Sequence, residues 1–184
     1  EMSASLVGSE MCIRDRFQAG YFLDKKYYDE NTIDFKHLLL SEKNQSLLKD
    51  IQNSNSVGVH IRRGDYMTKQ NLVIFGNICT QKYYHDAIRI ITEKVNDAVF
   101  YVFSDDISWV QTHLDIPNAV YVNWNTGESS IYDMYLMSSC KYNIIANSTF
   151  SYWAARLNKK TNMVIYPSKW YNTCLLYTSP SPRD

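Results

Sequence analysis

The run Ala98-Val-Phe-Tyr-Val-Phe103 constrains the fold of this chain more than any other feature. It is an unbroken series of apolar and aromatic residues, which is typical of a strand that is covered on both faces. Such strands occur in parallel sheets, because the connections between parallel strands place helices on both faces of the sheet. The rest of the sequence should therefore alternate between short apolar runs and segments with a helical period.

The sequence does alternate in this way. Four further apolar runs are predicted to be strands, and helices are predicted where apolar residues recur at helical spacing. The predicted strands are 57–61, 98–103, 119–122, 142–146 and 163–166, and the predicted helices are 81–95, 107–114, 129–140 and 149–158. Five strands separated by four helices predict an α/β fold with a parallel sheet and helices on both faces.

The segment before the first strand has a different character. Residues 17–55 are rich in aromatic residues and lysine, and they become helical near Ser46–Ile51. The polar stretch Asn53–Ser56 has the composition of a connecting segment, so we predict a linker there. The predicted organisation is the end of a first domain and a linker in residues 17–56, followed by the sheet domain in residues 57–173.

The two ends of the chain are related at the level of DNA. A DNA string that encodes the C-terminal end also encodes part of the N-terminal end when its complementary strand is read, and this string resembles a sequencing-library adapter. We therefore expect residues 1–16 and 174–184 to be adapter-derived and not native. Residues 17–173 would then be an internal piece of a longer protein and inactive by itself.

Composition excludes several classes of protein. The chain has 19 Lys and Arg against 19 Asp and Glu, and this balance argues against a partner such as nucleic acid or an acidic membrane surface. No run approaches the roughly 18 apolar residues of a membrane span. Cys79 and Cys140, the cysteines outside the predicted adapter ends, lack the spacing of a metal site or disulfide framework and are expected to be reduced and largely buried.

Polar side chains follow three of the predicted strands. Ligands of open α/β sheets bind at the carboxyl ends of strands, so these clusters should converge on one edge of the sheet. The clusters are Arg62-Arg63-Gly64-Asp65-Tyr66 after the first strand, Ser104-Asp105-Asp106 after the second, and Asn147-Ser148-Thr149-Phe150 after the fourth. Guanidinium groups bind phosphate oxygens with paired hydrogen bonds, and Ser or Thr at a helix start offers hydroxyl and N–H groups to an anion. Together the clusters predict a nucleoside diphosphate site.

Each cluster also has a purely structural interpretation. The arginines could be surface charges, and Asp105 and Asp106 could form a turn and cap a helix. Ser148 and Thr149 could likewise be helix caps, His60 a core histidine and Tyr66 a packing residue. The tripeptide Arg63-Gly64-Asp65 is also found in integrin ligands, so a non-catalytic adhesive or nucleotide-binding module is an alternative, which requires the tripeptide on an exposed loop.

Several of these segments carry a resemblance to a known family. The segment His60-Ile-Arg-Arg-Gly-Asp-Tyr66 resembles the HxRRxD motif shared by α-1,2-, α-1,6- and protein O-fucosyltransferases. Its RRGDY form is similar to glycosyltransferase family 11, the α-1,2-fucosyltransferases. Four other segments resemble that family in the right order: Gly20–Tyr28, Phe103–Asp106, Ile145–Trp153 and the PxxW-like Pro167–Trp170. The family's early glycine-rich segment has no counterpart in this sequence.

The resemblance implies a fold and a reaction. It implies a GT-B-like enzyme of which residues 57–173 form the Rossmann-like, GDP-fucose-binding half, with residues 17–56 at the end of the acceptor-side domain. The implied reaction is an inverting transfer of fucose from GDP-β-L-fucose to the 2-hydroxyl of a galactoside, with no metal and no other cofactor. A sister fucosyltransferase with another acceptor linkage is the alternative.

The resemblance also implies roles for individual residues. Arg62 would hold the diphosphate and assist its departure, and Arg63 would support it. Asp65 would orient the arginines or act as a base, and we favour orientation because a carboxylate beside two arginines is a weak base. The remaining residues implied to bind the donor are His60, Tyr66, Ser104, Asp105, Asn147, Ser148, Thr149 and Phe150, with Asp105 as the guanine acceptor.

Partners and compartment follow from the same resemblance. The implied partners are GDP-fucose and a galactose-terminated glycan, with no nucleic acid. An Asn-, Lys-, Ile- and Tyr-rich composition is typical of an AT-rich bacterial genome, which favours the bacterial cytoplasm or its membrane surface. A eukaryotic enzyme of this kind would instead be expected in the Golgi membrane. The sequence sets neither the acceptor glycan nor the oligomeric state.

Overall fold

The computed structural model describes residues 34–172 of the chain. The chain divides into two compact units, Glu1–His37 and Leu38–Asp184, and all of the helices and strands given below belong to the second unit. Both predicted adapter-derived ends and the segment Gly20–Tyr28 lie outside the described residues.

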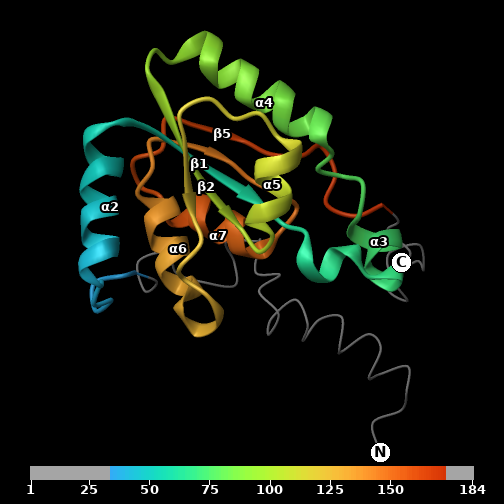
Figure 1. Cartoon of the computed structure of the whole chain (residues 1–184), viewed down its shortest axis with the longest axis horizontal. Coiled ribbons are helices and arrows are strands. Elements are labelled where there is room, and N and C mark those ends of the chain that lie inside the picture. The colour runs from blue at the N-terminus through green and yellow to red at the C-terminus, as the bar shows by residue number, and fades with distance from the viewer. Residues whose placement is uncertain (1–33, 173–184) are drawn as a thin grey trace, which may run out of the picture. The chain divides into compact units, whose positions relative to one another are not determined.

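Five parallel strands form the single sheet of the described region (Figure 1). They are β1 (Asn55–Ile61), β2 (Ala98–Ser104), β3 (Ala119–Val122), β4 (Tyr142–Ile144) and β5 (Met163–Ile165). Their spatial order is β3-β2-β1-β4-β5, so the chain builds outward from β1 on one side and then returns to its other side. This is the order of a Rossmann-like sheet, and it confirms the predicted fold class.

Helices cover both faces of this sheet (Figure 1). The helices α4 (Gln81–Lys94) and α5 (Ile107–His113) pack on one face, and α2 (Glu42–Asn53), α6 (Ser130–Ser138) and α7 (Thr149–Leu157) pack on the other. The strand β1 is buried from Ser56 to Ile61 because it lies at the centre of the sheet and between two helical layers. Alternation along β1 sends Val57, Val59 and Ile61 into the α4–α5 core.

Side-chain caps set the start of the helices α2, α4 and α5. The hydroxyls of Ser41 and Thr80 accept from N–H groups in the first turns of α2 and α4. The carboxylate of Asp106 accepts from the N–H of Trp109 and so begins α5. One of the structural interpretations of Asp106, a helix cap, is therefore confirmed.

The linker predicted at Asn53–Ser56 is wrong. The helix α2 ends at Asn53 and β1 begins at Asn55, so no connecting segment separates them. Ser56 is fully buried, and its hydroxyl accepts a hydrogen bond from the N–H of Lys141. A serine in a polar stretch is typical of a linker, but this serine is satisfied inside the sheet, and α2 packs on β1 as part of the same domain.

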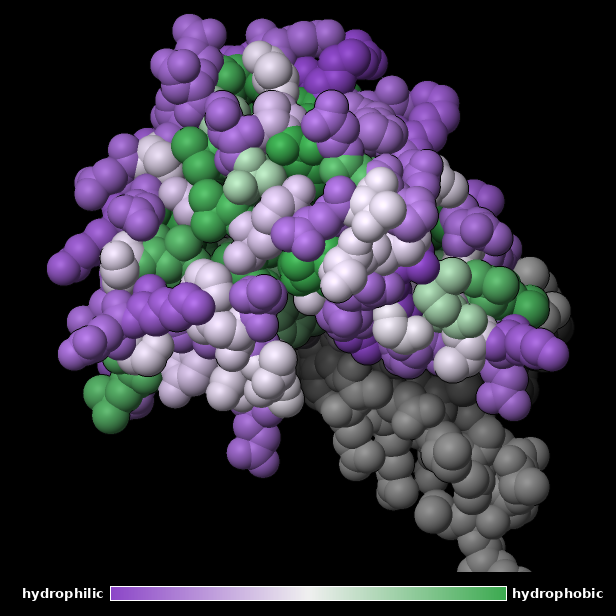
Figure 2. All heavy atoms as spheres, in the orientation of Figure 1, coloured by the Kyte–Doolittle hydropathy of each residue, from purple (hydrophilic) through white to green (hydrophobic). Residues whose placement is uncertain are grey.

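A helical segment that the sequence did not predict follows β1. The short 3-10 helix Gly64–Met67 (η2) and the helix α3 (Lys69–Phe75) lead from β1 to α4. Met67, Val73 and Ile74 are exposed large hydrophobic residues there, and Figure 2 shows hydrophobic atoms at the surface over α3. Main-chain contacts join this segment to the C-terminal part of the domain, because the N–H of Asn172 donates to the carbonyl of Ile74.

Candidate active site at the carboxyl edge of the sheet

The predicted site residues follow the carboxyl ends of β1, β2 and β4, as expected. The strands β1 and β4 are neighbours, although two other strands separate them in sequence. The direction of winding reverses between them, and this switch point is where open α/β sheets bind ligands. The residues after β1 and β4 therefore occupy the most favoured position for a site in this fold.

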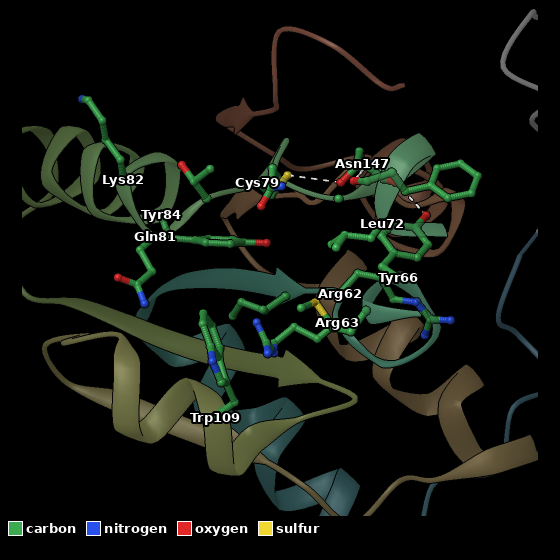
Figure 3. Close-up of a pocket in the computed structure, with 16 residues that line it drawn as sticks. Arg62, Arg63, Tyr66, Leu72, Cys79, Gln81, Lys82, Tyr84, Trp109 and Asn147 are labelled. Carbon is green, nitrogen blue, oxygen red and sulfur yellow. Dashed lines mark hydrogen bonds between the residues drawn. The ribbon is translucent and has the colours of Figure 1, made fainter. Parts of the chain in front are cut away.

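Strand alternation divides the His60–Arg63 segment between two sides. Val59 faces α4 and α5, so the next residue, His60, faces α6 and α7. There the ring of His60 contacts Phe150, with 5.1 Å between the ring centroids. Arg62 and Arg63 also point in opposite directions, and Figure 3 shows the guanidinium of Arg63 beside Trp109 and that of Arg62 turned away from it. The two arginines thus have different neighbours and different chemistry.

Arg62 lies between two carboxylates. Its Nη2 contacts Oδ1 of Asp65 at 2.7 Å, and its Nη1 contacts Oδ2 of Asp105 at 3.0 Å. Its side chain is about one-third exposed. This arrangement fixes a planar cation at the end of the central strand, where it can meet an anionic ligand.

Arg63 is held on the other side by Asp106 and Trp109. Its Nε donates to Oδ2 of Asp106 at 3.2 Å, and its guanidinium lies 3.7 Å from the centre of the Trp109 ring. The ring of Trp109 is also stacked on His113. The terminal Nη groups of Arg63 have no acceptor among residues 34–172, and they border a pocket.

The adhesive interpretation of Arg63-Gly64-Asp65 is contradicted by this geometry. The tripeptide begins directly after β1 at the carboxyl edge of the sheet, not at the tip of an exposed loop. Asp105 accepts from the N–H of Arg63, and Arg62 binds the carboxylate of Asp65. Gly64 and Asp65 are exposed, but Arg63 is held by Asp106 and Asp65 by Arg62, so the tripeptide belongs to the arginine–carboxylate cluster at the edge of the sheet.

His60 is only 5% exposed, and its Nδ1 has no hydrogen-bond partner among the described residues. Burial, with a smaller contribution from the charge of Arg62, lowers the pKa of His60 from 6.5 to about 3. The ring is therefore neutral near pH 7 and cannot supply a positive charge to a phosphate. Its tilted ring contact with Phe150 joins the end of β1 to the start of α7.

Asn147 joins the segments around the site. Its Nδ2 donates to the carbonyls of Phe75 and Trp170, and its Oδ1 accepts weakly from the thiol of Cys79 at 3.4 Å. Its own carbonyl accepts from the hydroxyl of Tyr66 at 2.9 Å. Because its amide already has protein partners, Asn147 positions the predicted motifs relative to one another, and it also borders the pocket.

The other predicted ligand residues have local contacts. The hydroxyl of Ser104 accepts from the N–H of Asp106 and shapes the turn after β2. Ser148 precedes α7 and is nearly buried, but its side chain does not cap the helix. The first N–H groups of α7, at Thr149 and Phe150, lack an acceptor within the helix, as at any helix start. The structure thus brings these residues to the same edge as Arg62 without showing a ligand contact.

A pocket of about 370 Å³ opens beside Arg63. Figure 3 shows Arg63 and Trp109 on one side of it, with Tyr84 and Cys79 on the other. Burial raises the pKa of Cys79 to about 11, so the thiol is protonated and a poor nucleophile near pH 7. Of the predicted site residues, Arg62, Arg63, Tyr66 and Asn147 border this pocket. The others do not, namely His60, Asp65, Ser104, Asp105, Ser148, Thr149 and Phe150.

Trp109, Tyr84 and Cys79 were missed by the sequence interpretation. Each lies in a helix or a connection remote in sequence from the arginines, and Tyr84 is a core position of α4 whose hydroxyl donates to the carbonyl of His60. Spacing alone gave no signal for them.

Among residues 34–172, no group of three His, Cys, Asp or Glu side chains is placed to hold a metal ion. The helices of the same region are each too short or too polar to span a membrane.

The order of the sheet and the arginine–carboxylate cluster at its switch point define a Rossmann-like α/β domain with a site suited to an anionic ligand. The chain belongs to glycosyl transferase family 11, which it matches over residues 12–178. This match confirms the predicted family. The matched range also extends into both ends that were predicted to be adapter-derived.

Relatives agree with this assignment. An α-1,2-colitosyltransferase of Escherichia coli is 36% identical over 83% of this chain and 55% of its own length. The O-antigen biosynthesis glycosyltransferase WbnK of Escherichia coli is 44% identical over 65% of this chain and 40% of its own. Galactoside α-(1,2)-fucosyltransferase 2 of Pongo pygmaeus is 29% identical over 66% of this chain and 37% of its own.

The chain spans about half the length of the curated relatives it matches. Among solved structures, the fucosyltransferase NodZ from Bradyrhizobium has a TM-score of 0.44 and 19% identity, covering 62% of this chain and 40% of NodZ.

Proposed function

We propose that this domain binds GDP-fucose, and that the complete enzyme transfers fucose with inversion to the 2-hydroxyl of a galactoside. The observation that carries the proposal is Arg62, which is fixed at the switch point of the sheet between Asp65 and Asp105. Membership of the family and similarity to a galactoside α-(1,2)-fucosyltransferase support this choice of donor and linkage.

In the proposed reaction the bond between C1 of fucose and the diphosphate oxygen breaks, and its electron pair goes to that oxygen. The acceptor oxygen forms the new bond to C1 from the opposite face, and its proton passes to a base or to solvent. Negative charge grows on the diphosphate as the bond breaks, and a fixed guanidinium stabilises it without a metal ion. We assign this role to Arg62. We keep His60 and Phe150, whose rings contact each other, as proposed neutral contacts of the donor.

Binding of GDP to the full chain tests the proposal directly. In buffer with EDTA and no divalent metal, GDP at about 100 times its Kd should raise the free energy of unfolding by about 2.7 kcal/mol. Arg62→Ala should remove most of this stabilisation. The matched control is Arg89→Ala, because Arg89 is an exposed arginine of α4 whose partners are Glu93 and Asp86. Equal stabilisation of all three proteins by GDP would refute the proposal.

Activity must be measured in the complete reading frame, because this chain spans about half the length of the curated relatives it matches. There, Arg62→Ala should lower kcat by a factor of about 10² to 10³, as the loss of a group that stabilises charge in the transition state. Unchanged turnover of that variant would exclude the proposed role of Arg62.

A second donor is favoured by one specific observation. The relative that aligns with 83% of the chain is an α-1,2-colitosyltransferase. Colitose lacks one hydroxyl of fucose, so the two donors share the GDP moiety and differ only in the sugar. Transfer assays with both donors and one galactoside acceptor would decide between them. If colitose is transferred faster than fucose, GDP-colitose becomes the proposed donor.

We further propose that the enzyme acts in the bacterial cytoplasm or at its membrane surface and modifies a galactose-terminated surface glycan. Two Escherichia coli relatives support this setting. Separation of cells that express the complete reading frame into soluble and membrane fractions tests the compartment, and a panel of glycan acceptors tests the acceptor.

A further inference from the structure

The two carboxylates on Arg62 are anchored very differently. Asp105 is the inner partner, with a side chain about one-quarter exposed. Its Oδ2 binds Arg62, and its Oδ1 accepts from the backbone N–H of Arg63 at 2.9 Å. Both oxygens of Asp105 are thus used by the segment that follows β1.

Gly64 leaves the space that Asp105 occupies. A Cβ atom added to Gly64 would lie 2.4 Å from Oδ2 and 3.2 Å from Cγ of Asp105, so the carboxylate occupies the space that any other residue at position 64 would need. Because residue 64 has no side chain, the carboxylate has the room to reach both Arg62 and the N–H of Arg63. Asp105 therefore supports the guanidinium through two contacts that depend on Gly64.

Asp65 is the outer partner, and its side chain is 53% exposed. Its carbonyl accepts from Thr68 and from the side chain of Asn71, so its main chain is held in η2. Its carboxylate contacts Arg62, the one ion-pair partner it has among residues 34–172. The side chain can therefore rotate into solvent at the cost of one exposed ion pair.

Phosphate and carboxylate oxygens compete for the same edge of a guanidinium, because both accept paired N–H groups. We infer that Asp105 is the positioning residue that orients Arg62, and that Asp65 is an exchangeable partner whose place on Arg62 a phosphate group of the donor takes. This inference rests on the proposed function for the identity of the donor. It differs from the sequence prediction that Asp105 accepts from guanine.

The two roles predict effects of opposite sign from the same chemical change. Asp65→Asn removes a competing negative charge and should tighten pyrophosphate binding by up to about fivefold, the upper limit expected for an exposed ion pair. Asp105→Asn removes the support of Arg62 and should weaken pyrophosphate and GDP alike, by about tenfold. Guanosine, which has no phosphate, should bind both variants as it binds the unaltered chain.

The experiment is calorimetric titration of the full chain with pyrophosphate, GDP and guanosine, at low salt and without divalent metal. Asp86→Asn is the matched control, because Asp86 is an aspartate of α4 with ion partners Lys82 and Arg89 and is remote in sequence from Arg62. This variant makes the same change of net charge and should leave all three affinities unaltered. Thermal unfolding of each variant checks that the fold is retained.

Three outcomes would overturn the inference. Weaker GDP binding with unchanged pyrophosphate binding in Asp105→Asn would assign Asp105 to guanine. Weaker pyrophosphate binding in Asp65→Asn would make Asp65 part of the anion site instead of its competitor. Tightening of pyrophosphate binding in Asp86→Asn equal to that in Asp65→Asn would reduce the Asp65 result to net charge. Absence of GDP binding by the unaltered chain would instead refute the proposed function, while pyrophosphate would still test the roles of the two aspartates.

Discussion

Gly64 is the residue at which the proposed site has the least room. Its added Cβ would lie within 2.4 Å of Asp105 Oδ2, and the nearest atoms belong to that one side chain. We expect Gly64→Ala to push Asp105 away from Arg62 and to weaken GDP and pyrophosphate by about tenfold, as Asp105→Asn should. Calorimetry of both single variants and the double variant checks this, because a shared mechanism makes the effects non-additive. Fully additive losses would count against it.

His60 leads to a prediction about acid stability. Its pKa falls from 6.5 to about 3 on folding, so the unfolded chain binds the proton more readily between these values. The free energy of unfolding should therefore fall as pH decreases from 6.5 toward 3, by up to about 1.4 kcal/mol per pH unit from this residue. Urea unfolding of His60→Gln should show a shallower dependence over that range. A slope equal to that of the unaltered chain would contradict the burial of a neutral ring.

At the scale of elements, a polar network joins α2, the segment after β3 and α6. Asn44 of α2 exchanges hydrogen bonds with Asn125 and accepts from the indole of Trp124, and Asn125 donates to Asp133 at 2.7 Å. Burial raises the pKa of Asp133 from 3.8 to about 7. The carboxyl group is therefore largely protonated in the folded protein below neutral pH, while in the unfolded chain it ionises near pH 4.

This network predicts a loss of stability as pH rises from 3.8 to about 7. The unfolded chain releases the proton of Asp133 first, so the contribution of this group to stability is complete below pH 3.8 and is lost as pH rises through about 7. Asp133→Asn keeps an oxygen that can accept from Asn125. It should raise the free energy of unfolding by on the order of 2 kcal/mol at pH 8 and change it little at pH 4. Urea titrations at the two pH values check this prediction. The contribution of Asp133 to stability falls as pH rises, whereas that of His60 falls as pH decreases.

At the scale of the whole molecule, the chain spans about half of its relatives, and its described fold holds one Rossmann-like domain. We expect it to bind GDP with the same affinity in EDTA and in MgCl₂, and to transfer no fucose on its own. Calorimetry in the two buffers and a transfer assay beside the complete reading frame measure both properties. A GDP affinity at least tenfold higher with Mg²⁺ would contradict the proposed metal-free site.

The sequence by itself determined the elements and their order. All five predicted strands are present, and the four predicted helices begin within one residue of their predicted starts. These features depend on local spacing, because apolar periodicity reports which faces of a segment must be buried. The sequence also placed Arg62, Asp105 and Asn147 at strand ends. It did not predict α3, whose span of Lys69–Phe75 is too short to show a helical period.

The tertiary structure decided which side chains meet. Ser56 belongs to the sheet because Lys141 gives it a hydrogen bond across the domain, and Arg63 faces a pocket because Trp109 of α5 lies beneath it. Arg62 and Arg63 differ because the turn after β2 gives them different partners, Asp105 for Arg62 and Asp106 for Arg63. Spacing along one strand fixes the direction of a side chain, but its partners come from segments about 40 residues away, and only long-range packing brings those segments together.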